Sequence, residues 1–101
     1  MLGHNVYFTL NDDTAANRQA LIDACQEYLT GHPGVAFFCV GTLVDDLNRP
    51  VNDQEFQVGL HVFFDSREAH DTYQVSQRHV QFIEQNKANW KQVRVFDSSD
   101  A

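Results

Sequence analysis

Residues 56–64 read Phe-Gln-Val-Gly-Leu-His-Val-Phe-Phe and carry the clearest structural signal of the chain. Apolar side chains occupy every second position from Phe56 to Phe64, which is the period of a strand with one buried face. We expect the segment 35–43 to be a strand covered on both faces, because it is apolar almost throughout, with a bulge or close backbone approach at Gly41. Two further segments have strand composition, 4–10 and 90–97.

A helix is predicted between the first two strands. The polar segment 11–14 supplies capping oxygens for its start, and the Gly-His-Pro-Gly sequence at 31–34 ends it. An apolar stripe at helical spacing runs between these signals. The stripe comprises Ala16, Ala20, Leu21, Ala24, Cys25, Tyr28 and Leu29.

A second helical region precedes the last strand. Asp65 with Glu68 resembles a capping box and opens a short helix to about Tyr73. Ser76 can cap a further helical stretch that runs to about Lys87. The residues of this stretch that we expect to face the core are His79, Val80, Phe82 and Ile83.

The order β-α-β-β-α(α)-β predicts an α+β fold, the ferredoxin-like βαββαβ arrangement with an antiparallel four-stranded sheet. The helices would cover one face of the sheet. The other face is too apolar and aromatic to be left in water, so we expect a homodimer in which two sheets face each other. This face carries Tyr7, Thr9, Phe37, His61, Phe63, Arg94 and Phe96.

Length and charge restrict the classes of partner. The 101 residues are expected to form one domain, 1–101. A net charge of −7 argues against a nucleic-acid partner, because phosphate binding needs clustered Lys and Arg. With no apolar run near the ~20 residues of a membrane-spanning helix, and no signal-peptide pattern at the start, no membrane partner is expected. Cys25 and Cys39 are expected to be buried free thiols, which favours a reducing, cytoplasmic location.

Tyr73, His79 and His4 are the candidate catalytic residues. Tyr73 and His79 lie on either side of the break between the two helical stretches, so both side chains can face one cavity. In the first turn of a helix, His79 would stay neutral and serve as a general base for a C–H next to a carbonyl. The Tyr73 hydroxyl would stabilise the enolate, and His4 would hold Tyr73 or a second carbonyl. Such chemistry needs no metal and no cofactor.

A structural interpretation is equally open. A His and a Tyr that are buried together can satisfy each other's hydrogen bonds and hold the junction of two helices. His61 and His70 lack partners at metal-ligand spacing, so no metal site is expected. The acidic residues of the 44–54 region and Glu55 fit a solvated loop better than a cation site.

Several segments, in this order and spacing, resemble the stress-responsive alpha/beta-barrel domain family (Dabb), also called dimeric alpha+beta barrels. The matching pieces are His4 at the start of the first strand, His-Pro-Gly-Val at 32–35, and the segments 62–73, 79–82 and 93–97. The resemblance implies a ferredoxin-like fold and a homodimer that forms an α+β barrel.

For function the resemblance implies less. One member, olivetolic acid cyclase, closes a linear tetraketide by an aldol condensation without a cofactor, and its catalytic Tyr and His fall on Tyr73 and His79. Its cavity His falls on His4, and like residues stand at Phe82, Trp90, Val93, Val95 and Asp97. With Val6, Phe8, Leu60 and Val62 from the helix-facing sides of the strands, the apolar members of this set are the predicted substrate-binding residues.

Two departures from the family bear on the substrate. The family usually has His-Pro-x-His before the second helical stretch, whereas this chain has no Pro in 75–79. The cyclase's third-strand His falls on Val58, while His61 falls on the dimer-facing side. Three aromatic side chains are also available to fill the cavity: Phe8, Phe38 and Phe64.

Three functions therefore stay open from the sequence. The first is a homodimeric domain whose small apolar cavity binds a small apolar or keto ligand. The second is a cofactor-independent cyclase, isomerase or lyase that uses His79 as base and Tyr73 as hydrogen-bond donor. The third is a purely structural stress protein with a closed core.

Overall fold

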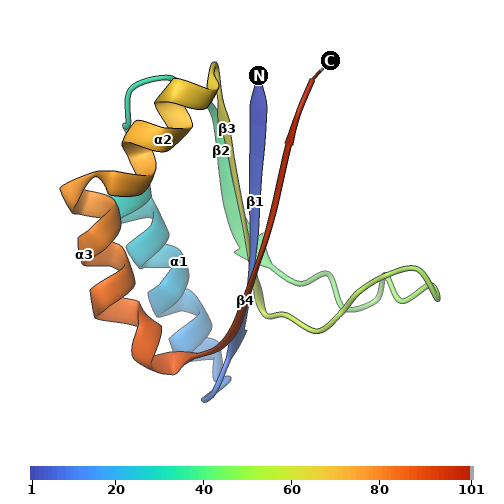
Figure 1. The fold of residues 1–101 in the computed structure, drawn as a ribbon. Coiled ribbons are helices and arrows are strands. Elements are labelled where there is room, and N and C mark those ends of the chain that lie inside the picture. The colour runs from blue at the N-terminus through green and yellow to red at the C-terminus, as the bar shows by residue number, and fades with distance from the viewer. Residues whose placement is uncertain (101) are drawn as a thin grey trace.

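The computed structural model describes residues 1–100 and shows a four-stranded sheet with all of its helices on one side (Figure 1). Along the chain the elements are β1 (Leu2–Leu10), α1 (Ala15–Leu29), β2 (Val35–Thr42), β3 (Val58–Phe64), α2 (Arg67–Val75), α3 (Gln77–Asn86), the 3-10 turn η1 (Lys87–Asn89) and β4 (Trp90–Ser99). The strand order is β2-β3-β1-β4 and every neighbouring pair is antiparallel. The predicted α+β ferredoxin-like fold is confirmed.

The register separates the two faces of the sheet as the sequence pattern predicts. His4 pairs with Val62, and Val6 pairs with Leu60, so these side chains share the face that the helices cover. Val58, Leu60, Val62 and Phe64 are all buried there. Tyr7 pairs with Gly59 and Arg94 on the opposite face, which no helix covers (Figure 1).

The strand β2 corrects three expectations. It is covered on one face only, because the helices lie on a single side of the sheet, and its burial alternates from Phe37 to Val40. Cys39 is therefore exposed in the single chain, while Cys25 is buried as expected. The irregularity of pairing with β3 falls between Val35 and Phe37 and not at Gly41.

Helix boundaries differ from the prediction by a residue or two. Ser66, not Asp65, is the N-cap of α2, and its hydroxyl accepts a hydrogen bond from the N–H of Ala69 at 3.1 Å. The caps at Thr14 and Ser76 are confirmed.

Burial along the helices corrects the predicted apolar stripes. Ala16, Ala20 and Val80 are exposed, while Ile22 is buried and was not in the predicted stripe. Alanines contribute little to a helical stripe, so their exposure leaves the packing of α1 on Leu21, Cys25 and Leu29 intact.

The C-terminal segment continues the sheet further than expected. Ser98 and Ser99 belong to β4 and pair with Gly3 and Leu2. The N-terminal ammonium also contacts the Asp100 carboxylate at 2.8 Å. Met1 and Asp100 therefore lie side by side, and β1 and β4 are neighbours in the sheet (Figure 1).

Gly34 sets the distance between the turn after α1 and helix α2. Its φ is +80°, and a Cβ at this position would come within 2.5 Å of the Cβ of Ala69. Its carbonyl also accepts a hydrogen bond from the N–H of Asp65 at 2.8 Å, just before α2 begins. Gly34 thus permits the approach that places α2, with His70 and Tyr73, against the sheet.

Replacement of Gly34 by Ala is expected to destabilise the fold more than the same change at Gly31. Gly31 has a similar φ of +74°, but a Cβ there would meet only Arg78 Nη1, at 4.0 Å, so Gly31→Ala measures mainly the backbone strain, about 1–2 kcal/mol. Gly34→Ala adds the clash with Ala69, roughly 1–3 kcal/mol more. Chemical denaturation of the two variants gives the difference, and equal losses would contradict the close approach.

Candidate functional site

Ser76 fixes the position of Tyr73 relative to His79 through two hydrogen bonds of its side chain. Its hydroxyl donates to the carbonyl of Tyr73 at 2.9 Å and accepts from the N–H of His79 at 3.2 Å. The residue ends α2 and begins α3, so one side chain joins the two helices. The rings of Tyr73 and His79 consequently lie with their centroids 4.8 Å apart.

A cavity of about 130 Å³ lies between these helices and the covered face of the sheet. His4, Tyr73 and His79 all line it, so the three candidate catalytic residues are brought together as predicted. Seven of the predicted substrate-binding residues also line it: Val6, Phe8, Leu60, Phe82, Trp90, Val93 and Val95. The cavity extends to the side of β4, where Val93 and Val95 are partly exposed.

Val62 is the predicted lining residue that the cavity does not reach. It is fully buried in the core, paired with His4 and Phe38. Leu29, Gln74 and Ile83 line the cavity and were missed. The helical stripes contained Leu29 and Ile83 as core residues, but only the packing of α1 and α3 shows that they border a void.

Tyr73 and His79 do not satisfy each other's hydrogen bonds. The Tyr73 hydroxyl and His79 Nδ1 are both buried, and neither has a hydrogen-bond partner within residues 1–100. Buried polar atoms of this kind are uncommon in native structures and call for an explanation, such as a ligand. Both groups belong to residues that line the same cavity. Neither atom has surface that a water-sized molecule can touch, so a ligand would serve them only after a small side-chain movement.

Burial shifts both groups away from ionisation. Burial lowers the pKa of His79 to about 4, and the nearby His4 and His32 add to the effect. The backbone of Gln74 near the ring opposes it in part. Burial also raises the pKa of Tyr73 well above its usual value, with a smaller contribution from Cys25. At neutral pH the site thus presents a neutral imidazole and a protonated phenol.

His4 is held from two sides. Its Nδ1 lies 2.5 Å from Oδ1 of Asp97 in β4, and its Nε2 lies 3.3 Å from the amide nitrogen of Gln74 in α2. Its ring meets Tyr73 edge-on with centroids 6.1 Å apart. The expectation that His4 bonds the Tyr73 hydroxyl is not met, because the hydroxyl has no partner within the described residues.

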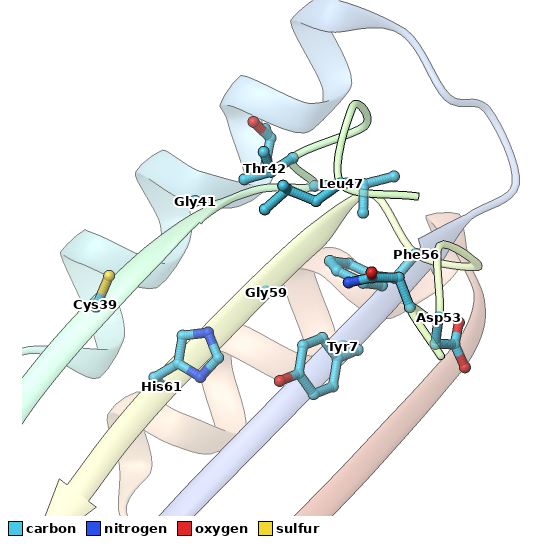
Figure 2. A pocket seen from close by; sticks show the side chains of 12 residues that line it. Tyr7, Cys39, Gly41, Thr42, Leu47, Asp53, Phe56, Gly59 and His61 are labelled. Carbon is cyan, nitrogen blue, oxygen red and sulfur yellow. The ribbon is translucent and has the colours of Figure 1, made fainter. Parts of the chain in front are cut away.

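A larger hollow of about 360 Å³ lies on the opposite face of the sheet, beneath the loop that joins β2 to β3 (Figure 2). Tyr7 and His61 stand on its floor, and Phe56 and Asp53 come from the loop. His61 Nδ1 already contacts Asn5 Oδ1 at 2.7 Å, and both oxygens of Asp53 are within 3.0 Å of the Arg94 guanidinium. The hollow is therefore a weaker candidate for polar recognition than the cavity beside Tyr73.

Two further histidines lie near the cavity. The His32 side chain contacts the Tyr28 carbonyl near the C-terminus of α1 through Nε2 at 2.8 Å. His70 lacks partners at metal-ligand spacing along the sequence, but in three dimensions His4 and Asp97 lie beside it. Sequence spacing did not reveal this group, since its members come from β1, α2 and β4.

Comparison with known proteins gives a family and a fold. The description of the matching family is "Stress responsive A/B Barrel Domain" (Dabb), and the match covers residues 2–100. No curated protein matches the chain. A protein of Arabidopsis thaliana, At3g17210, has 19% sequence identity and a TM-score of 0.82, over 100% of this chain and 96% of that one.

Two other solved structures illustrate the range of the fold. A dimeric ferredoxin-like protein of unknown function from Thermobifida fusca has 13% identity and a TM-score of 0.81, over 98% of this chain and 90% of that one. The hydroxynitrile lyase of Passiflora edulis has 16% identity and a TM-score of 0.75, over 96% and 90%. At these low sequence identities, the comparison shows a shared fold and no shared activity. Among the helices of residues 1–100, none is long and apolar enough to cross a membrane.

Proposed function

The chain belongs to the stress responsive A/B barrel domain family. Because this fold does not by itself define a reaction, we propose a function from the residues of the cavity. The cavity binds a small organic carbonyl compound, and His79 and Tyr73 move a proton on it. The observation that supports this proposal is the pair of buried, unpartnered polar atoms, the Tyr73 hydroxyl and His79 Nδ1, on residues that line one cavity.

The pKa of His79 restricts the substrate. An imidazole with a pKa of about 4 is a weak base, so it takes a proton at a useful rate only from a C–H bond that is already acidic. A carbon between two carbonyl groups meets this condition. His79 would remove the proton, the Tyr73 hydroxyl would donate a hydrogen bond to the enolate oxygen, and His79 would return the proton to carbon or oxygen.

The size of the cavity restricts the substrate further. A volume of about 130 Å³ is less than half of the roughly 300 Å³ that a drug-sized ligand needs. A long polyketide of the cyclase type does not fit this space, whereas a β-dicarbonyl of a few carbon atoms does. The reaction class is therefore an isomerisation by proton transfer, and the cyclase alternative is the weaker of the two.

The same proposal includes the assembly and the compartment. We expect residues 1–101 to act as one domain in a homodimer, with Tyr7, His61, Phe63 and Phe96 at the interface. The solved structure from Thermobifida fusca is described as dimeric. Phe37 and Phe96 on the open face are more than half exposed in the single chain. The free thiols Cys25 and Cys39 support a cytoplasmic location.

A pH titration of the His79 ring by NMR tests the cavity proposal. We expect a pKa near 4 in the free protein, far below the ~6.5 of an exposed imidazole. Acetylacetone, a small neutral β-dicarbonyl, is expected to shift the His79 signals, because it would occupy the cavity beside Nδ1. The other histidines near the ring are His4 on β1, His32 after α1 and His70 on α2, and their signals must be followed as well.

His79→Asn provides the assignment and the control. The variant keeps a polar atom near the position of Nδ1 and removes the titrating signal. A His79 ring that neither titrates nor responds to acetylacetone would indicate a sealed structural pair, and the enzyme hypothesis would be abandoned. A response of His61 alone would place the ligand on the open face instead.

A further inference from the structure

A second polar cluster adjoins the cavity where β1, α2 and the end of β4 meet. It consists of His4, His70 and Asp97, and one ligand-type atom from each lies within 4.8 Å of the others. We infer that this cluster binds a divalent transition-metal ion of the Zn²⁺ type. Two imidazoles that are each hydrogen-bonded to a carboxylate suit such ions, and the Gln74 amide oxygen can add a third ligand.

Both imidazoles are already oriented by carboxylates. His4 Nδ1 contacts Asp97 Oδ1 at 2.5 Å, and His70 Nδ1 contacts Asp71 Oδ1 at 2.9 Å. A neutral imidazole that donates from Nδ1 carries its lone pair on Nε2. Histidines that ligate metals usually have such a hydrogen bond on the other ring nitrogen, because it fixes the tautomer and the ring orientation.

The two Nε2 atoms point toward a common place. The side-chain amide nitrogen of Gln74 lies 3.3 Å from His4 Nε2 and 3.5 Å from His70 Nε2. A single amide group thus lies between two acceptors, and the second contact is at the limit of a hydrogen bond. A cation can satisfy both lone pairs at once, and a half-turn of the Gln74 amide would then present its oxygen to the ion.

Asp97 supports the set from β4. Its Oδ1 contacts His4 Nδ1, on the side of the ring away from Nε2, so the carboxylate orients His4 and does not itself ligate an ion at Nε2. The burial of the three residues is graded, with His4 buried, His70 half-buried and Asp97 exposed, so an ion can enter from the Asp97 side. A net charge of −7 also raises the local concentration of cations.

The inference does not rest on the proposed proton transfer. Neither Tyr73 nor His79 belongs to the donor set, so either proposal can fail while the other stands. The two meet at His4, which lines the cavity and belongs to the cluster. A bound ion would therefore lie beside the cavity wall.

Metal titration of the chelator-treated full chain tests the inference. Calorimetry with ZnCl₂ is expected to give one ion per chain, and CoCl₂ is expected to give visible absorption bands typical of nitrogen and oxygen ligands. His70→Gln is expected to weaken Zn²⁺ binding at least about tenfold. Asp97→Asn and Asp71→Asn, which remove the carboxylates that orient the two rings, are each expected to weaken it about tenfold, the lower end of the range for outer-shell partners. Glu68→Gln removes a neighbouring carboxylate of α2 outside the cluster and should leave the affinity unchanged.

A measurement on the native protein covers the case in which a variant does not fold. Zn²⁺ should shift the ring nitrogen signals of His4 and His70 in NMR spectra and leave those of His61 in place. The inference is overturned if Zn²⁺ shifts neither ring, or if folded His70→Gln and Asp97→Asn bind Zn²⁺ as tightly as Glu68→Gln does.

Discussion

Replacement of both Tyr7 and Phe63 by Asp is expected to abolish the homodimer. Both side chains lie on the sheet face that no helix covers, and Tyr7 contacts Phe56, His61 and Phe96 there, at centroid distances of 4.8, 5.8 and 5.9 Å. In a symmetric interface each substitution appears twice, so four unpaired carboxylates would be buried. Burying an unpaired charge costs several kcal/mol, which is enough to dissociate an interface of ordinary size.

Light scattering after size exclusion measures the result. The native protein is expected to have the mass of two 11.6 kDa chains, and the double variant that of one chain. Val80→Glu is the matched control, because it adds a charge to an exposed apolar residue of α3 on the helical side. If the double variant unfolds, the milder Phe96→Ser, at a side chain that is 54% exposed in the single chain, should weaken the dimer and leave circular dichroism unchanged. A folded double variant of native mass would place the interface elsewhere.

Replacement of His79 by Asn is expected to lower proton transfer in the cavity by about 10²–10⁴-fold, the usual contribution of a general base. The rate can be followed by NMR as deuterium exchange at the central carbon of acetylacetone, after subtraction of the buffer rate. Because only the neutral imidazole accepts a proton, the native rate should be constant above about pH 5 and fall as the pH drops through the His79 pKa of about 4. A native rate equal to that of His79→Asn would contradict the proposal.

Tyr73→Phe separates a catalytic role from a structural one. The Tyr73 hydroxyl is buried and has no hydrogen-bond partner in residues 1–100, so its removal should leave stability unchanged or slightly raised. The exchange rate should nevertheless fall, by the roughly 10²–10³-fold that removal of an oxyanion-stabilising donor causes. A structural hydroxyl would give the opposite pattern, with lost stability and an unchanged rate.

The residues on the covered face of the sheet could be predicted, because the alternation of side chains along a strand is a periodic pattern within a short segment. Alternation from Val58 to Phe64 placed those residues on the core side, and the register confirms it. The cap at Ser76 was predictable for a similar reason, since a capping hydroxyl bonds an N–H only three residues away. The sequence by itself therefore determined the fold and the positions of Tyr73 and His79 relative to each other.

Only the tertiary structure decided how much space and which polar partners these residues have. Cys39 is exposed, and Val93 is 39% exposed beside the cavity, because the helices cover one side of the sheet and leave part of β4 open. The contacts of His4 with Gln74 and Asp97 join residues 70 and 93 positions apart, and no periodic pattern encodes such distances. Side-chain periodicity determines which face a residue occupies, whereas the docking of α2 and α3 on β1 determines which side chains meet there.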